Sequence, residues 1–253
     1  MSIIRTSGII LHKIPYSESS VILKTYTRES GLISLMAKGA KRPKSKFRGL
    51  LDLFTEYELL YREKNNNTII TLQEASFEKQ FTNIAKNIQK QSLANIFLEI
   101  YLRHLYGPEQ SAPLYESLEN NLADLNVRQF PPANAPLYLC DFLLQFCGLM
   151  GFKPQFVTCI HCQEHPSITG CTFDLEMGGP ICLNCKLKSR FRSNHLPSQL
   201  MYWLTEMQTR GAHAGLLAPN KMKMAEELLL SFLYTQSSRG GQLKAYPFYR
   251  SMI

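Results

Sequence analysis

The spacing of apolar residues changes near residue 81, and this change constrains the fold more than any other feature of the sequence. Up to that point, short runs rich in β-branched residues, such as residues 21–26 and 32–37, are separated by turn-forming residues. Five such runs in so short a segment are typical of a small closed barrel. We therefore predict an OB-type β-barrel for residues 1–80.

Beyond this point the apolar residues recur at steps of three and four, which is the spacing of one helix face. The pattern predicts a helical bundle over residues 81–158, whose first long helix ends at Gly107-Pro108. Residues 159–195 lose this period and gain cysteine and glycine, as in a metal-binding module. Residues 196–253 are expected to form C-terminal helices packing on the helical domain, with a basic tail. The predicted fold class is a multidomain α+β chain, with an N-terminal OB-type barrel, a central and C-terminal helical domain, and an embedded four-cysteine zinc module.

Two Cys-x-x-Cys pairs are separated by 19 residues, and each pair can form a turn whose sulfurs point at one ion. Four thiolates suit a tetrahedral zinc ion and leave no coordination position for a reactive water. We predict one structural Zn²⁺ ion held by Cys159, Cys162, Cys182 and Cys185. The alternatives are a chance group of reduced core cysteines and a redox pair, and His161, His165 or Cys171 could replace a ligand. Cys140 and Cys147 are expected to be small buried hydrophobic residues.

The net charge is +8, with 28 Lys and Arg against 20 Asp and Glu, and such an excess attracts polyanions. Residues 38–49, which we call the basic loop, contain six cations and no acid, and their glycine and proline residues prevent regular structure. Six phosphate contacts to a single strand would give a slope of log K against log salt concentration of about −4. The predicted DNA contacts are Lys38, Lys41, Arg42, Lys44, Lys46, Phe47 and Arg48.

Phe47 is the candidate for stacking on bases, whereas Tyr26 and Phe54 are expected to be core residues. Arg5, Lys24 and Arg28 could extend the cationic patch if they lie on the same face. The alternative interpretation of the basic loop is a solvated charge run that only keeps the protein soluble.

The sequence contains none of the motifs GxxxxGK[ST], GxSxG, HExxH or DxDxDG, so we expect a binding protein and no enzyme. No apolar stretch approaches the roughly 20 residues of a membrane-spanning helix, and the N-terminal apolar run is too short for a secretion signal. With cysteines at metal-type spacing, these features predict a cytoplasmic protein with no membrane partner.

Several segments together resemble the RecO family of bacterial recombination mediators. They are Gly8-Ile9-Ile10-Leu11, Tyr16-Ser17-Glu18-Ser19-Ser20, Thr27-Arg28-Glu29-Ser30-Gly31, residues 37–45 with their continuation to Phe54, Leu149-Met150-Gly151-Phe152 and residues 178–185. The resemblance implies an OB fold, a helical domain, a zinc element, binding of single- and double-stranded DNA and annealing of complementary strands. It also implies partnership with RecR, often RecF, and the tail of single-stranded-DNA-binding protein, so that RecA is placed on coated DNA. Gln163 and Lys186 depart from the small glycine that often follows the second cysteine of such a turn.

The combined prediction is a non-enzymatic, DNA-binding recombination mediator in DNA repair, which neutralises backbone charge on two strands at once. The basic tail, with Lys244 and Arg250, would supply a second cationic surface. The alternative is a zinc-containing protein-interaction scaffold in which DNA contact is incidental. A hydrolase with an unrecognised site is the third candidate.

Overall fold

The computed structural model describes residues 2–63, 69–105, 112–166, 171–187, 194–237 and 241–253. The chain divides into two compact units, Met1–Phe130 with Leu243–Ile253, and Pro131–Gln242. The helix end predicted at Gly107-Pro108 lies outside the described residues. The four-part division at residues 80, 158 and 195 stays a prediction.

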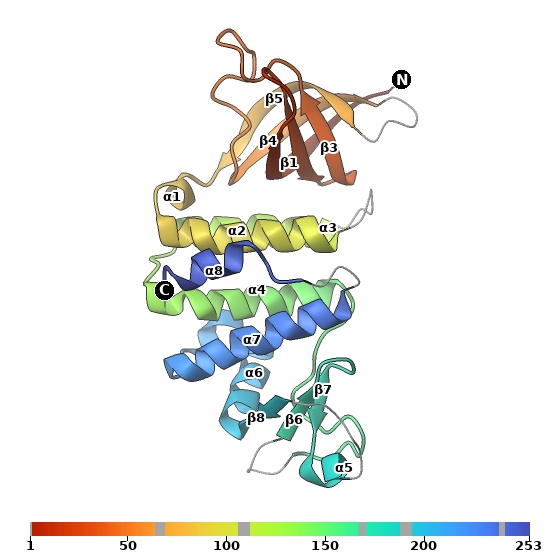
Figure 1. The fold of residues 1–253 in the computed structure, drawn as a ribbon, viewed down its shortest axis with the longest axis vertical. Helices are drawn as coiled ribbons and strands as arrows, with labels where there is room; N and C mark the ends of the chain where they lie inside the picture. The colour runs from red at the N-terminus through yellow and green to blue at the C-terminus, as the bar shows by residue number, and fades with distance from the viewer. Residues whose placement is uncertain (1, 64–68, 106–111, 167–170, 188–193, 238–240) are drawn as a thin grey trace. The chain divides into compact units, whose positions relative to one another are not determined.

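The first unit begins with a closed five-stranded barrel, whose strands follow the order β1-β2-β3-β5-β4 (Figure 1). The strands are β1 (Ser2–Pro15), β2 (Val21–Thr27), β3 (Gly31–Ala37), β4 (Thr55–Glu63) and β5 (Ile70–Gln80). Neighbouring strands are antiparallel except β3 and β5, which are parallel. The predicted OB-type barrel and the α+β class are confirmed.

The long strand β1 closes the barrel because its two ends pair with different neighbours. Its first part pairs with β4 and its second part with β2, and a register shift follows Ile10. Gly8 belongs to both ladders, opposite Thr27 and Tyr57. A Cβ atom at Gly8 would lie 2.7 Å from Leu59 Cδ1, so any other residue at this crossing point would displace the Leu59 side chain.

The barrel interior is filled by apolar side chains from every strand, including Ile10, Leu23, Leu35, Tyr57, Leu59, Tyr61 and Leu72. Tyr26 and Phe54 are also buried, as predicted. This packed interior is a core and not a channel. Any ligand of the barrel must therefore bind on its outer surface or its loops.

The described residues of the first unit also form the helices α1 (Thr82–Ala85), α2 (Ile88–His104), α3 (Ala112–Val127) and α8 (Ala245–Arg250). The Asn87 side chain caps α2 by accepting from the N–H groups of Gln89 and Lys90. The buried Lys90 ammonium donates to the carbonyls of Asn126 (3.0 Å) and Arg128 (2.8 Å). Lys90 thus satisfies carbonyls at the C-terminal end of α3, where a cation is favoured.

The second unit combines helices with a small three-stranded sheet of order β7-β6-β8. Its elements are η1 (Pro132–Asn134), α4 (Ala135–Leu149), β6 (Cys171–Asp174), β7 (Gly179–Ile181), α5 (Leu183–Leu187), β8 (Asn194–Leu196), α6 (Ser198–Arg210), η2 (Gly211–Ala214) and α7 (Pro219–Gln236). Helix α4 packs on α7. Cys140 and Cys147 are fully buried on α4, as predicted. No helix in the described part of the chain is long and apolar enough to span a bilayer.

Candidate functional site

The basic loop lies in the connection between β3 and β4 and is a chain of consecutive turns. Four backbone hydrogen bonds each join residues three positions apart: Arg42 to Gly39, Ser45 to Arg42, Arg48 to Ser45, and Leu50 to Phe47, all 3.0–3.1 Å. In each of them the N–H of the later residue donates to the carbonyl of the earlier one. These bonds fix the backbone of a segment that has neither helix nor strand.

Two apolar side chains anchor this connection in the barrel core. Phe47 is only 3% exposed and Leu51 is also buried, and both pack among the core residues. The N–H of Asp52 donates to the hydroxyl of the buried Tyr57 at 2.7 Å. The prediction that Phe47 stacks on bases is therefore wrong, because its ring fills the barrel interior. This role could not be predicted from the sequence, because the cations around Phe47 do not indicate whether its side chain is buried or exposed.

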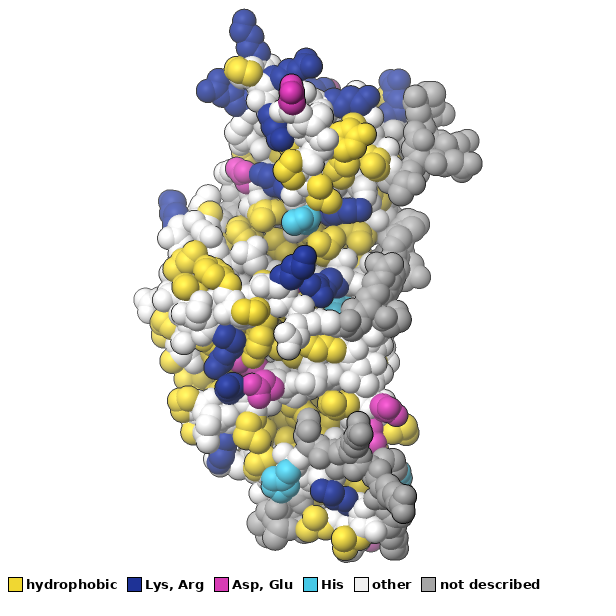
Figure 2. All heavy atoms as spheres, viewed as in Figure 1, with side chains coloured by type: hydrophobic (Ala, Val, Ile, Leu, Met, Phe, Trp, Pro, Cys, Tyr) yellow, Lys and Arg dark blue, Asp and Glu magenta, His cyan; other side chains and the backbone are white. Residues whose placement is uncertain are grey.

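The six cations of the basic loop point into solvent and keep their charge uncompensated. All six are exposed, and none forms an ion pair with an acid among the described residues. Their partners are neutral: Lys41 Nζ donates to Ser17 O (3.2 Å), Arg48 to Pro43 O (3.3 Å), and Lys46 Nζ lies 5.3 Å from the Phe47 ring centroid. Figure 2 shows Lys and Arg side chains gathered at the end of the barrel that carries the loop. The loop is thus a concentrated positive surface.

Three other cations of the barrel form ion pairs with acids, in contrast to those of the basic loop. Arg5 pairs with Glu58 at 2.8 Å, and Lys13 pairs with Asp52 at 3.3 Å. Arg28 lies 3.5 Å from Glu116 and 3.4 Å from Glu119 of α3. Arg5 and Arg28 therefore do not extend the cationic patch.

The contact between Arg28 and α3 belongs to a charged network between the barrel and this helix. The carboxylate of Glu56, only 1% exposed, accepts a hydrogen bond from the Tyr115 hydroxyl at 2.8 Å. Lys79 pairs with both Glu56 (3.6 Å) and Glu119. Burial raises the pKa of Glu56 above its ordinary value, although the Tyr115 hydroxyl favours the carboxylate. These ion pairs hold α3 against the barrel. Because Arg28 and Lys79 are paired with acids, their charges are compensated.

The four predicted cysteine ligands come together in the second unit. The sulfur atoms of Cys159, Cys162, Cys182 and Cys185 all lie within 4.8 Å of one another. The Cys162 and Cys182 sulfurs are 3.7 Å apart. A tetrahedral ion with Zn–S bonds of about 2.3 Å requires sulfurs about 3.8 Å apart. The cluster can therefore hold one metal ion.

Each pair of cysteines is shaped by a tight turn. In the first turn, Gln163 N–H donates to Cys159 O (2.9 Å) and Cys159 N–H donates to Glu164 O (2.8 Å). Gln163 has a φ of 63°, in the left-handed region that favours glycine. In the second turn, Lys186 N–H donates to Cys182 O at 2.9 Å, at the start of α5. The backbone of Gln163 is thus strained, whereas that of Lys186 is not. The first turn therefore forms with glutamine at the position where glycine is often found.

Backbone donors favour the thiolate form of one ligand, Cys159. The N–H of Cys182 points at Cys159 Sγ at 3.4 Å. Burial alone would raise the pKa of Cys159, but N–H groups of Cys162, Cys182 and His161 outweigh it and lower the pKa to about 6. Within the described residues the cluster includes neither His161 nor His165. It also excludes Cys171, whose thiol donates to Met201 Sδ at 3.4 Å. The four-cysteine set is therefore complete without a substitute.

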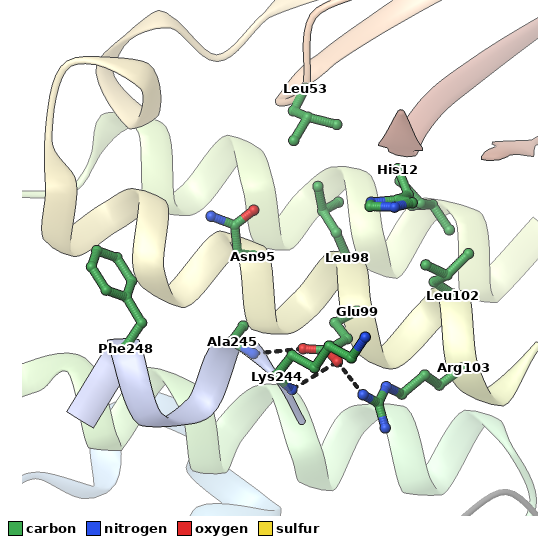
Figure 3. Close-up of a pocket in the computed structure, with 11 residues that line it drawn as sticks. His12, Leu53, Asn95, Leu98, Glu99, Leu102, Arg103, Lys244, Ala245 and Phe248 are labelled. Carbon is green, nitrogen blue, oxygen red and sulfur yellow. Dashed lines mark hydrogen bonds and ion pairs between the residues drawn. The ribbon is translucent and has the colours of Figure 1, made fainter. Parts of the chain in front are cut away.

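A separate pocket of about 430 Å³ lies in the first unit between β1, α2 and α8 (Figure 3). Its wall carries the Glu99 carboxylate, which pairs with Arg103 at 2.6 Å. The same carboxylate accepts from the N–H groups of Lys244 and Ala245, both at 2.8 Å. Glu99 therefore fastens the N-terminal end of α8 to α2. The basic tail forms α8, and the Lys244 backbone belongs to this contact while its side chain is exposed. A second cationic surface at the tail stays a prediction.

Comparison with known proteins matches both parts of the chain to one family. Residues 1–81 match the family described as recombination protein O N terminal, and residues 85–244 match recombination protein O C terminal. A DNA repair protein RecO of Desulfatibacillum aliphaticivorans is 27% identical over 237 residues, which cover 91% of this chain and 90% of that protein. A second, from Listeria monocytogenes, is 28% identical over 198 residues, covering 78% and 74%. These names denote repair proteins and no enzymatic activity, and the chain belongs to the RecO family of DNA repair and recombination proteins.

Proposed function

We propose that this protein is a non-enzymatic recombination mediator that binds single- and double-stranded DNA, anneals complementary strands and helps to load a recombinase on coated single strands. One observation carries the proposal: the six cations of the basic loop are exposed and uncompensated by any described acid. A surface with so many unpaired charges in one place binds a polyanion by releasing its counterions. The proposed contacts are Lys38, Lys41, Arg42, Lys44, Lys46 and Arg48.

Annealing is opposed by repulsion between two phosphate backbones, and an anchored cationic loop reduces this repulsion. The loop backbone is fixed by its turns and by Phe47, so little ordering entropy is lost when DNA binds. Contacts to phosphates alone carry no sequence information, so binding should tolerate any sequence. Both features suit a protein that pairs strands whose sequence it does not choose.

We further propose that the cysteine cluster holds one Zn²⁺ ion with a structural role. The sulfur spacing fits a tetrahedral zinc ion, and four thiolates leave no position for a substrate or a reactive water. The ion would join the turn at residues 159–164 to the start of α5, which are otherwise linked by few apolar contacts. Zinc would therefore brace the second unit.

Membership in the RecO family supports the proposed partners, which are RecR, RecF, the tail of single-stranded-DNA-binding protein and, indirectly, RecA. A role in DNA repair also supports a location with the chromosome in the cytoplasm. These partners would bring the DNA-bound protein to single strands that are already coated.

The proposal is tested by reversing three charges of the basic loop and measuring the annealing of complementary oligonucleotides. The variant carries Lys41→Glu, Arg42→Glu and Lys44→Glu, and its matched control carries Lys153→Glu, Lys221→Glu and Lys223→Glu in the second unit. At 0.1 M salt, losing three contacts should weaken single-strand binding at least about 100-fold. Annealing should slow in the loop variant and persist in the control. Equal annealing by the loop variant and the wild type would remove the basic loop from the function, and a wild type that does not bind DNA would favour the scaffold.

A further inference from the structure

The turn between β1 and β2 is fastened to the basic loop by three hydrogen bonds. Lys41 N–H donates to Ser19 O at 2.9 Å, and Lys41 Nζ donates to Ser17 O at 3.2 Å. Gly39 N–H donates to the Ser20 hydroxyl at 3.3 Å. The turn, residues 16–20, and the basic loop therefore form one continuous surface.

Tyr16 is the aromatic residue of this surface. Its side chain is exposed, with 59% of the residue accessible to solvent. Its backbone is held, because its N–H donates to Ser20 O at 3.2 Å and the Ser20 N–H donates to Ser17 Oγ at 3.1 Å. The preceding Pro15 still pairs with Val21 in the barrel. The ring is thus presented to solvent from a fixed base, directly beside the residue whose carbonyl holds Lys41.

The other aromatic residues of the barrel segment are buried or pack against a buried ring. Of the eight between residues 1 and 81, six are buried: Tyr26, Phe47, Phe54, Tyr57, Tyr61 and Phe81. Phe77 is 46% exposed, but its ring packs against Tyr57 with centroids 5.6 Å apart. Tyr16 is therefore the aromatic residue that both faces solvent and borders the cations.

We propose that Tyr16 is a stacking platform for an unpaired base of single-stranded DNA whose phosphates are held by the basic loop. Base stacking on an aromatic ring tolerates any sequence, because every base has a flat face. A duplex offers no free base face except at its ends, so Tyr16 would favour single strands while the cations bind both forms. The inference rests on the proposed DNA-binding function and adds to it the group that distinguishes single from double strands.

The turn contains one acid, Glu18, whose charge can be removed independently of the Tyr16 ring. Glu18 is exposed and has no ion pair with a described cation. Its carboxylate would repel a phosphate that approaches Lys41, whereas it would not disturb a base on Tyr16. Glu18→Gln should therefore strengthen binding of single and double strands alike, which separates the effect of charge from that of stacking.

The test measures fluorescence anisotropy of the full chain with a labelled oligo-dT strand, a duplex of equal length, and a strand whose central positions are abasic. The variants are Tyr16→Ala and Tyr16→Phe. The matched control is Tyr202→Ala, because Tyr202 of α6 is 67% exposed and lies in the other unit. Melting temperatures confirm that each variant is folded.

We expect Tyr16→Ala to weaken oligo-dT binding about 10- to 100-fold and duplex binding less than threefold. Tyr16→Phe and Tyr202→Ala should bind like the wild type, and the abasic strand should bind the wild type and Tyr16→Ala equally weakly. If Tyr16→Ala binds oligo-dT as tightly as the wild type while the loop reversal variant loses binding, the stacking role fails and the proposed function stands. If the wild type binds none of the probes, both fail.

Discussion

The basic loop and the cysteine cluster are both irregular segments that bring similar side chains together, but they do so by opposite means. In the basic loop the functional groups repel one another and point outwards, and an apolar ring, Phe47, points inwards to hold them. In the cluster the functional groups converge to within 4.8 Å of one another, at a site that is partly exposed. The loop is therefore stabilised by the barrel, whereas the cluster requires a ligand of its own.

This difference explains why one region can serve as a binding surface and the other as a brace. A cation that is exposed to water needs no ion pair, because water solvates its charge and the free energy of folding changes little. Six such cations can therefore remain unpaired until a polyanion binds. Four converging thiolates without a cation would repel strongly, so their free energy depends on metal. The two regions should respond differently to metal removal, to loss of an anchor and to relief of backbone strain.

Metal removal should produce the largest difference between the two regions. A structural zinc site contributes roughly 10 kcal/mol or more in isolated zinc fingers, because the ion binds only the folded form. A strong chelator should abolish hydrogen-exchange protection at residues 159–164 and 182–186 and leave the protection of the barrel strands unchanged. Cys185→Ser should act like the chelator. Unchanged exchange at the cluster after complete metal removal would contradict a bracing role.

Loss of the loop anchor should have the next largest effect. Phe47→Ala removes a ring that is 3% exposed, which typically costs about 3–5 kcal/mol of unfolding free energy. Urea unfolding followed by barrel signals should shift to lower concentration, and exchange protection of residues 42–50 should fall. Phe248→Ala is the control, because Phe248 is partly exposed and its truncation should change stability by less than about 1 kcal/mol. An unfolding midpoint of Phe47→Ala equal to that of the wild type would mean that the loop does not depend on the barrel.

Relief of strain in the first cysteine turn should have the smallest effect. Gln163→Gly places glycine at a φ of 63°, and we expect a gain of about 0.5–1 kcal/mol despite the greater freedom of glycine in the unfolded chain. The apparent zinc affinity, measured by competition with a chelating dye, should rise about two- to fivefold. Lys186→Gly is the control, since Lys186 has no positive φ and lies in α5, so that glycine should weaken the site. A fall in affinity for Gln163→Gly would show that the glutamine side chain itself stabilises the turn.

The barrel and the cysteine cluster could be predicted from sequence because each depends on local patterns. Alternation of apolar residues specifies which strand face is buried, and the spacing of the two cysteine pairs limits where their sulfurs can meet. The direction of Phe47 could not be predicted, because it is decided by the barrel interior and not by its charged neighbours. The pairing of Arg28 with Glu119 joins residues that are 91 positions apart, and a contact of that separation leaves no mark in a single sequence.

In the proposed function, uncompensated charge on the basic loop binds the phosphate backbone of DNA. This binding is tested most directly by titrating oligo-dT binding against salt for the wild type and for the variant with Lys41→Glu, Arg42→Glu and Lys44→Glu. Six contacts predict a slope of log K against log salt concentration of about −4, and three remaining contacts predict about −2. A wild-type slope near zero, or the same slope for both proteins, would contradict the account.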